Sequence, residues 1–143
     1  MIHKPLPQRL VVFLDANVML SAAWSQTSFV AEALRAAGPI QFLTCTYAVD
    51  EARRNLQAKR PESLAAFDEL LTRIRVVATI IEDQLDLPIN AKDRPIYVSA
   101  KAAKADILLT GDKDFQSLAA SHPNPRIMTP RELLTCLLAG LAE

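Results

Sequence analysis

Short apolar runs alternate with longer segments of helical pattern along this chain, and this alternation restricts the possible folds more than any other feature. The apolar runs predict strands at residues 10–14, 40–45, 76–81, 107–110 and 126–128. The intervening pattern predicts helices at residues 17–23, 28–37, 46–59, 62–73, 93–104, 115–120 and 130–141. Strands that alternate with helices favour a parallel sheet with helices on both faces and right-handed crossovers. We therefore expect an α/β fold with a parallel sheet of about five strands.

The chain has 143 residues, enough for one domain with its own core, and we expect a single domain over residues 1–143. Its formal net charge is zero, so no overall positive field indicates nucleic-acid binding, although a local basic patch is compatible with this balance. Cys45 and Cys136 match no metal-binding spacing, and both are expected to be small buried residues in a reducing compartment. The N-terminus lacks the apolar core of a signal peptide, and no stretch approaches a membrane span, which predicts a cytoplasmic protein.

Four acidic residues stand where predicted strands end or in the helices that follow them. Asp15 directly follows the first apolar run and Asp112 follows the fourth, while Glu51 and Asp93 lie in the helices after the second and third runs. In an open α/β sheet, ligands bind outside the carboxyl ends of the strands. If the first and fourth strands are neighbours, Asp15 and Asp112 lie side by side at this edge. We therefore predict that Asp15, Glu51, Asp93 and Asp112 are the catalytic residues.

Carboxylates that lie within a few ångströms of one another repel, and a bound divalent cation removes this cost. Carboxylate oxygens suit Mg²⁺ or Mn²⁺, which we expect to be the cofactor. Two such ions, roughly 3.5–4 Å apart, support phosphodiester hydrolysis in known two-metal sites. A histidine base is not expected, because His3 lies in the N-terminal tail and His122 in a loop rich in proline.

Three further polar residues are expected to orient the acidic site, namely Asn17, Thr110 and Asp114. Asn17 lies two residues after Asp15, although an amide at this position is nearly as typical of an ordinary helix start. Thr110 closes the fourth apolar run. Asp114 either joins the site or caps the helix predicted at residues 115–120.

The acidic residues also have purely structural interpretations. Asp15 and Asp93 can cap the helices that follow them, a common role for aspartate. Asp50 competes with Glu51, because neighbouring helical residues point about 100° apart and only one of the two can face the sheet edge. The apolar neighbours on the helix favour Glu51. Asp106 precedes the fourth strand and therefore belongs to the opposite edge of the sheet, which excludes it from the predicted site.

Basic residues are frequent in the segments that carry Glu51 and Asp93. A solvated helix face is the ordinary explanation for such residues, and binding of the phosphates that flank a scissile bond is the functional one. Both interpretations stay open for Arg53, Arg54, Lys59, Arg60, Lys92, Arg94, Lys101 and Lys104.

Taken together, the chain resembles the PIN-domain ribonucleases along nearly its whole length. The resemblance is carried by Asp15-Ala-Asn17, by Glu51-Ala-Arg-Arg, by Asp93-Arg-Pro-Ile and, most specifically, by the strand that ends in Thr110-Gly-Asp112-Lys-Asp114-Phe. It implies a three-layer α/β/α sandwich and cleavage of single-stranded RNA that depends on Mg²⁺ or Mn²⁺.

The resemblance also implies partners and a set of metal ligands. Many small bacterial PIN proteins resemble VapC-like toxins, which are inhibited by a small antitoxin protein and are often homodimers. Asp15, Asp93 and Asp112 are the expected metal ligands, and Glu51 completes the acidic cluster. One departure is that related sequences often carry another acid shortly before the position of Asp93, where this chain has Ala91 and Lys92.

Two other classes of protein stay open as alternatives. A Mg²⁺-dependent phosphohydrolase or receiver-like domain also places an aspartate after the first strand. Such a phosphohydrolase usually has a second aspartate two residues later, where this chain has Asn17. The other alternative is a non-catalytic module with the same fold that binds RNA or a protein. A stable acyl-phosphate on Asp15 would favour the first alternative, and no binding of millimolar metal would favour the second.

Overall fold

A computed structural model describes residues 9–25, 27–35, 39–81 and 87–142 of the chain. This part of the chain forms one five-stranded sheet in which every neighbouring pair of strands is parallel, in the order β3-β2-β1-β4-β5. The strands are β1 (Leu10–Leu14), β2 (Ile40–Cys45), β3 (Arg75–Val77), β4 (Ile107–Leu109) and β5 (Arg126–Met128).

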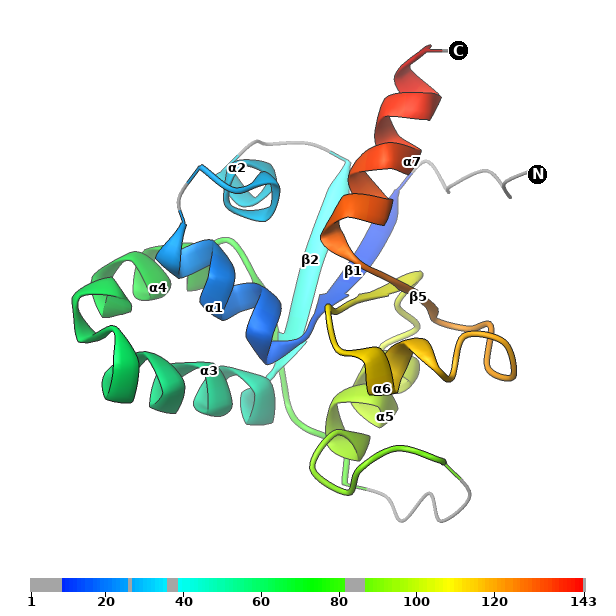
Figure 1. Ribbon diagram of the computed structural model, residues 1–143, viewed down its shortest axis with the longest axis horizontal. Helices are drawn as coiled ribbons and strands as arrows, with labels where there is room; N and C mark the ends of the chain where they lie inside the picture. The colour runs from blue at the N-terminus through cyan, green and yellow to red at the C-terminus, as the bar shows by residue number, and fades with distance from the viewer. Residues whose placement is uncertain (1–8, 26, 36–38, 82–86, 143) are drawn as a thin grey trace.

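Helices cover both faces of this sheet (Figure 1). The helical elements are α1 (Ala16–Trp24), α2 (Phe29–Arg35), α3 (Thr46–Lys59), the 3₁₀ turn η1 (Pro61–Ser63), α4 (Leu64–Leu71), α5 (Arg94–Ala102), α6 (Lys113–Gln116) and α7 (Pro130–Ala142). Helices α1 to α4 gather on one side of the sheet, and α5 and α6 lie on the other. Right-handed crossovers require this, because the chain moves from β1 outward to β3 and then returns across the sheet to β4 and β5. The α/β sandwich predicted from the sequence is confirmed.

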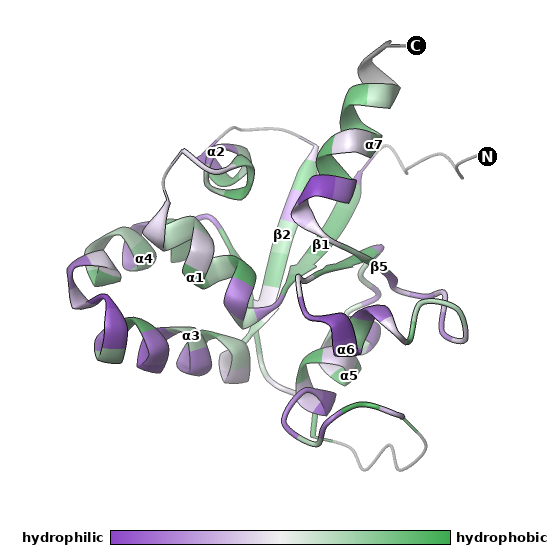
Figure 2. Cartoon of the chain, in the orientation of Figure 1, coloured by the Kyte–Doolittle hydropathy of each residue, from purple (hydrophilic) through white to green (hydrophobic). Residues whose placement is uncertain are grey.

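The strands are almost wholly apolar because the sheet lies between two layers of helices, which bury the side chains on both of its faces. Phe13 and Leu14 of β1 are completely buried, as is all of β4. Figure 2 shows the contrast between these strands and α3, whose outward side is hydrophilic. None of the helices in the described ranges combines the length and the apolar character that crossing a membrane requires.

The third strand is shorter than the apolar pattern predicted. We expected residues 76–81, but β3 contains only residues 75–77 and lies at the edge of the sheet. The residues after it bind helices instead of continuing the ladder. The Thr79 hydroxyl accepts a hydrogen bond from the Tyr47 backbone N–H, and the Ile80 N–H donates to the Ser99 hydroxyl. The strand prediction failed because β-branched residues also suit a connection that packs against helix ends.

Two smaller expectations were also wrong. The helix predicted at residues 115–120 begins earlier and ends sooner, because Asp112 caps α6 by accepting a hydrogen bond from the Asp114 N–H. Cys136 is only half-buried, whereas Cys45 is completely buried as expected.

The helix predicted at residues 28–37 ends at Arg35 in the described part of the chain, and residues 36–38 lie outside it.

Asp106 has a structural role at the amino end of the sheet. Its carboxylate accepts a hydrogen bond from the Val11 N–H at 2.8 Å, and its own N–H donates to the Val11 carbonyl at 2.9 Å. These bonds join the start of β4 to β1. Asp106 therefore lies at the opposite end of the strands from Asp15 and Asp112, as its position before β4 predicted.

Candidate metal and catalytic site

The strand order puts a topological switch point between β1 and β4 at the carboxyl end of the sheet, and this position is called the crevice. From β1 the chain proceeds to β2 and β3 on one side, whereas β4 and β5 lie on the other. The connections that leave β1 and β4 therefore diverge to opposite faces of the sheet. Ligands of open α/β sheets bind at such a switch point. Asp15 follows β1 and Asp112 lies three residues after β4, so both stand at this crevice.

The register of β1 and β4 explains the contact between Asp15 and Thr110. Leu14 pairs with Leu109, so the next residues of the two strands, Asp15 and Thr110, lie opposite each other. The Thr110 hydroxyl donates to Asp15 Oδ2 at 2.7 Å, and the Ala16 N–H donates to Asp15 Oδ1 at 2.7 Å. Both Asp15 and Thr110 are buried. The orientation of the Asp15 carboxylate is therefore determined by two hydrogen bonds.

Burial is the largest influence on the Asp15 carboxyl group and raises its pKa above the ordinary value. The hydrogen bonds from Thr110 and Ala16 oppose this rise, and the charges of Glu51 and Asp112 add to it. These electrostatic effects place Glu51 and Asp112 near Asp15, although the three residues are far apart in the sequence. A raised pKa at a crevice is typical of functional carboxylates, and of some structural ones.

Asp93, Asp112 and Asp114 form the tightest group of carboxylates in the described part of the chain. One oxygen atom from each of them lies within 4.8 Å of the others. The loop after β4 is held in place because Asp112 Oδ1 accepts a hydrogen bond from the Asp114 N–H and the Asp112 N–H donates to the Thr110 hydroxyl. Asn90 donates to Asp114 Oδ2 at 3.0 Å. This brings the segment before α5 against the loop after β4.

Asp93 stands at the first position before α5, yet its side chain makes no capping hydrogen bond. The residue is 5% exposed, and its Oδ2 atom has no hydrogen-bond partner among the described residues. Burial raises the pKa of Asp93 from 3.8 to about 6, and the charges of Asp112, Asp15 and Glu51 act in the same direction. Lys92 opposes the rise. The capping interpretation therefore has no hydrogen bond to support it, and Asp93 forms no ion pair with any residue that the structure describes.

Glu51 and Asp50 are neighbours in α3, so their side chains point in different directions. Glu51 is half-buried and Asp50 is exposed. The charge of Glu51 raises the pKa of both Asp15 and Asp93, while Asp50 has no such effect on either of them. Glu51 is therefore the acid of α3 that faces the crevice, at the margin of the group formed by Asp93, Asp112 and Asp114.

Asn17 is not drawn into this group. It is exposed on the first turn of α1, and its side chain makes no hydrogen bond with any described residue. Sequence reasoning missed Asn90, which holds Asp114, and Thr44, which donates from the adjacent strand to the Leu14 carbonyl at 2.8 Å. The only available signal for Thr44 was a hydroxyl at the end of an apolar run. Asn90 had no signal, because its partner lies 24 residues away.

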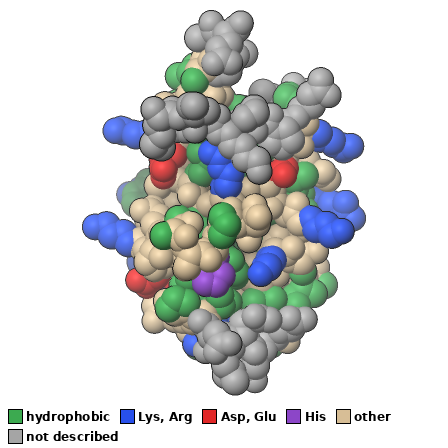
Figure 3. Space-filling view, turned by 90° about the vertical axis from the view of Figure 1, so that its right-hand side faces the viewer, with side chains coloured by type: hydrophobic (Ala, Val, Ile, Leu, Met, Phe, Trp, Pro, Cys, Tyr) green, Lys and Arg blue, Asp and Glu red, His purple; other side chains and the backbone are tan. Residues whose placement is uncertain are grey.

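Some of the basic residues contact side chains away from the crevice, and others lie near the crevice. Arg53 forms an ion pair with Asp68, and Arg60 lies over the ring of Trp24 at 3.9 Å. Arg54 and Lys92 both lower the pKa of Tyr47, a residue at the crevice. Figure 3 shows Lys and Arg side chains dispersed over one face of the molecule rather than gathered into a basic surface.

His122 does not join the acidic group. His3 lies outside the described residues. His122 packs its ring edge-on against Tyr97, with 6.2 Å between the ring centroids, and bonds to the Ser121 hydroxyl.

The residues at the crevice fit a divalent cation. The donor set consists of three carboxylates, and hard oxygen ligands suit Mg²⁺ and Mn²⁺. The buried and unpartnered Asp93 Oδ2 is the independent sign, because an orphaned charged oxygen is costly unless a cation or a proton satisfies it. This group of three contains Asp114 and not Asp15, each of whose oxygens accepts one hydrogen bond. Asp15 as a metal ligand stays a prediction.

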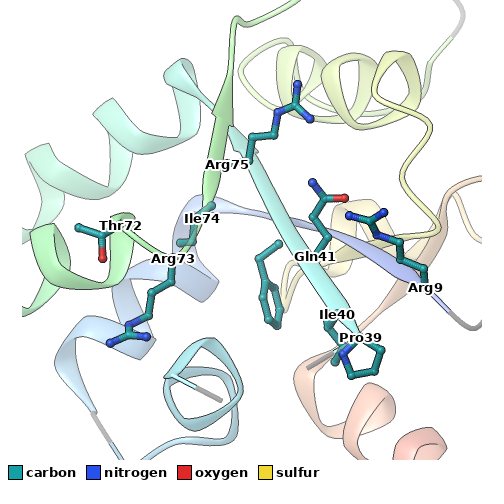
Figure 4. Close-up of a pocket in the computed structure, with 9 residues that line it drawn as sticks. Arg9, Pro39, Ile40, Gln41, Thr72, Arg73, Ile74 and Arg75 are labelled. Atoms are coloured by element: carbon teal, nitrogen blue, oxygen red, sulfur yellow. The ribbon is translucent and has the colours of Figure 1, made fainter. Parts of the chain in front are cut away.

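A cavity of about 600 Å³ opens elsewhere, at the amino end of the sheet (Figure 4). Arg9, Gln41 and Arg75 line it from the starts of β1, β2 and β3 and point to the same side of the sheet. Among the residues that the structure describes, none that lines this cavity is acidic. Because the strands are parallel, a strand length separates it from the carboxylates. The cavity is therefore not part of the acidic site.

A parallel sheet in this order, with acidic side chains converging at its switch point, defines the class of protein to which this chain belongs. A family model described as the PIN domain matches residues 11–114, a range that includes all four predicted catalytic acids. The chain therefore belongs to the PIN-domain family, whose members are nucleases. No curated protein matches the chain by sequence.

Two solved structures show the same fold. One is a chain of the structure of VapBC-1 from nontypeable Haemophilus influenzae, with 17% sequence identity to this chain and a TM-score of 0.61. The match covers 85% of this chain and 99% of that one. The other is a chain of the structure of VapBC2 from Rickettsia felis, bound to a DNA fragment from their promoter, with 16% sequence identity and a TM-score of 0.60. The match covers 84% of this chain and 98% of that one. At these identities the likeness concerns the fold.

Proposed function

We propose that this protein is a metal-dependent endoribonuclease that cleaves single-stranded RNA at the crevice between β1 and β4. The observation that carries this proposal is the buried Asp93 carboxylate, which has a free oxygen and lies beside Asp112 and Asp114. Three carboxylates so close together favour a divalent cation, and the PIN-domain family makes phosphodiester hydrolysis the reaction to test first.

In this proposal Asp93, Asp112 and Asp114 hold the ion, with Asp15 and Glu51 at its margin. When bound, the ion supplies positive charge and Lewis acidity for hydrolysis of the phosphodiester. Thr110 holds the Asp15 carboxylate in one orientation through the 2.7 Å hydrogen bond. Burial and neighbouring charge raise the pKa of Asp15, which suits a group that accepts a proton from an attacking water.

The test is cleavage of a fluorescent single-stranded RNA by the purified chain. We expect cleavage with Mn²⁺ or Mg²⁺ and loss of at least 99% of the rate when EDTA removes the metal, because the carboxylates then repel both one another and the phosphate. The same RNA annealed to its complement serves as the control and is expected to be cleaved much more slowly. Cleavage that persists at full rate in EDTA would contradict the proposal.

We infer further that the chain is the toxin of a toxin–antitoxin pair. Support comes from its fold, which matches that of a chain in two structures named VapBC. The partner would be a small antitoxin protein, and the chain itself would form a homodimer. We expect the product of a short adjacent reading frame to co-purify with the chain and to suppress RNA cleavage. Separate elution of the two proteins, with unchanged cleavage, would remove this part of the proposal.

A further inference from the structure

Tyr47 lies on the first turn of α3, beside the acidic site. Tyr47, Glu51 and Arg54 are spaced at i, i+4 and i+7, so they lie along one face of the helix. This face is distinct from the buried one, which is formed by Ala48, Ala52 and Leu56. Because Glu51 faces the crevice, Tyr47 and Arg54 lie along its border.

The position of Tyr47 is held by the segment after β3. Its backbone N–H donates to the Thr79 hydroxyl at 2.8 Å, and the hydroxyls of Thr46 and Thr79 lie 2.9 Å apart. The Tyr47 side chain itself is half-buried, and its hydroxyl makes no hydrogen bond with any described residue. Tyr97, in contrast, is 1% exposed and belongs to the core. The backbone of Tyr47 is therefore held in place, and part of its side chain is open to solvent.

The charged groups near Tyr47 include both carboxylates and cations. Burial raises the pKa of Tyr47, and the charges of Glu51 and Asp93 add to this effect. Arg54 and Lys92 act in the opposite direction. Arg54 lies two turns along α3 from Tyr47, and Lys92 directly precedes Asp93, so both cations belong to the segments that carry the acidic site. Neither Arg54 nor Lys92 forms an ion pair with a described carboxylate.

We propose that Tyr47, Arg54 and Lys92 form a nucleotide subsite, in which the Tyr47 ring stacks on a base of single-stranded RNA and the two cations contact the neighbouring phosphate. This subsite deepens the proposed function and rests on it for the identity of the substrate. Aromatic rings bind single-stranded nucleic acid by stacking on bases, and basic residues follow its phosphates. The arrangement supplies both elements next to the carboxylates that would act on the phosphodiester.

The first test is binding of a fluorescent uridine hexanucleotide to the full chain, in an Asp112→Asn background that keeps the RNA intact. We expect Tyr47→Leu, which removes the ring but keeps an apolar side chain, to weaken binding about tenfold or more. Tyr47→Phe keeps the ring and is expected to bind within about twofold of the unmodified residue. Trp24→Leu is the matched control, because Trp24 is half-exposed but lies at the far end of α1.

The second test identifies the base that stacks on Tyr47. A series of hexanucleotides, each with one abasic position, is bound to the chain with Tyr47 and to the Tyr47→Leu variant. We expect one abasic position to weaken binding to the Tyr47 chain and to have little effect in the variant, because the two changes remove the same contact. Arg54→Ala and Lys92→Ala are each expected to reduce the salt dependence of binding by about one phosphate contact.

The subsite would be overturned if the Tyr47→Leu variant bound every hexanucleotide as tightly as the chain that keeps Tyr47 and unfolded at the same temperature. In that case, metal-dependent cleavage by the native chain still decides the proposed function separately. A Tyr47→Leu change in an otherwise native chain is expected to raise KM about tenfold with kcat nearly unchanged, which a purely structural role would not do.

Discussion

Replacing Asp112 with asparagine is expected to lower the rate of RNA cleavage by about a thousandfold or more, while leaving the fold intact. A thousandfold loss corresponds to about 4 kcal/mol of transition-state stabilisation, which is the scale expected for a metal ligand. Asparagine keeps an oxygen that accepts the hydrogen bond from the Asp114 N–H, so the loop after β4 stays in place. Gel-based cleavage rates and thermal unfolding of the purified variant provide the measurement.

Asp15→Asn is expected to behave in the same way, because its Oδ1 still accepts from the Ala16 N–H and the Thr110 hydroxyl can rotate to accept. Asp106→Asn is the matched control at the other end of the strands, where its bond with Val11 is structural. It is expected to lower stability and to leave the cleavage rate of the folded protein unchanged. Full activity in a folded Asp112→Asn or Asp15→Asn variant would refute the assignment of the site.

Asp93→Asn is expected to stabilise the metal-free protein at pH 7.5 and to remove most of its response to metal. The folded-state pKa of Asp93 is about 6, above its ordinary value of 3.8, so folding favours the protonated form. Wild-type stability is therefore full below about pH 4 and falls as the pH rises from about 4 to about 6, because ionisation in the folded state is then penalised. The neutral amide escapes this cost.

The gain in stability should be about 1–2 kcal/mol above pH 6, since solvent around the half-buried Asp112 and the exposed Asp114 screens part of the effect. For a chain of this length this corresponds to a rise of roughly 3–6 °C in the unfolding temperature. Thermal scans in EDTA at pH 4 and pH 7.5 measure it, and the gain should be absent at pH 4. Metal should raise the unfolding temperature of the wild type at pH 7.5 but hardly that of Asp93→Asn.

Asp50→Asn provides the control for this experiment, because Asp50 is exposed on α3 beside Glu51. It should change neither the pH dependence nor the metal response. A destabilised Asp93→Asn variant in EDTA at pH 7.5 would show that the carboxylate is needed for folding rather than for a cation, and would end the metal assignment at this position.

The order of strands and helices was predictable because burial between two helical layers leaves continuous apolar runs, as in β1 and β4. The third strand was not predictable in length. Its apolar run continues past Val77, but β3 lies at the sheet edge, and Thr79 and Ile80 bond to helical elements instead. An apolar run indicates which side chains are buried, but it does not indicate which backbone groups form hydrogen bonds with a neighbouring strand.

The sequence by itself determined that Asp15 and Asp112 follow buried strands. It also determined that Glu51 lies in a helix and Asp93 at a helix start, both next to the same sheet edge. It did so because apolar runs and helix starts are local properties of the chain. Only the tertiary structure decided which carboxylates come closest together, namely Asp93, Asp112 and Asp114 rather than a set with Asp15. The physical reason is that hydrogen bonds from distant segments orient these groups, as when Thr110 engages Asp15 across 95 residues.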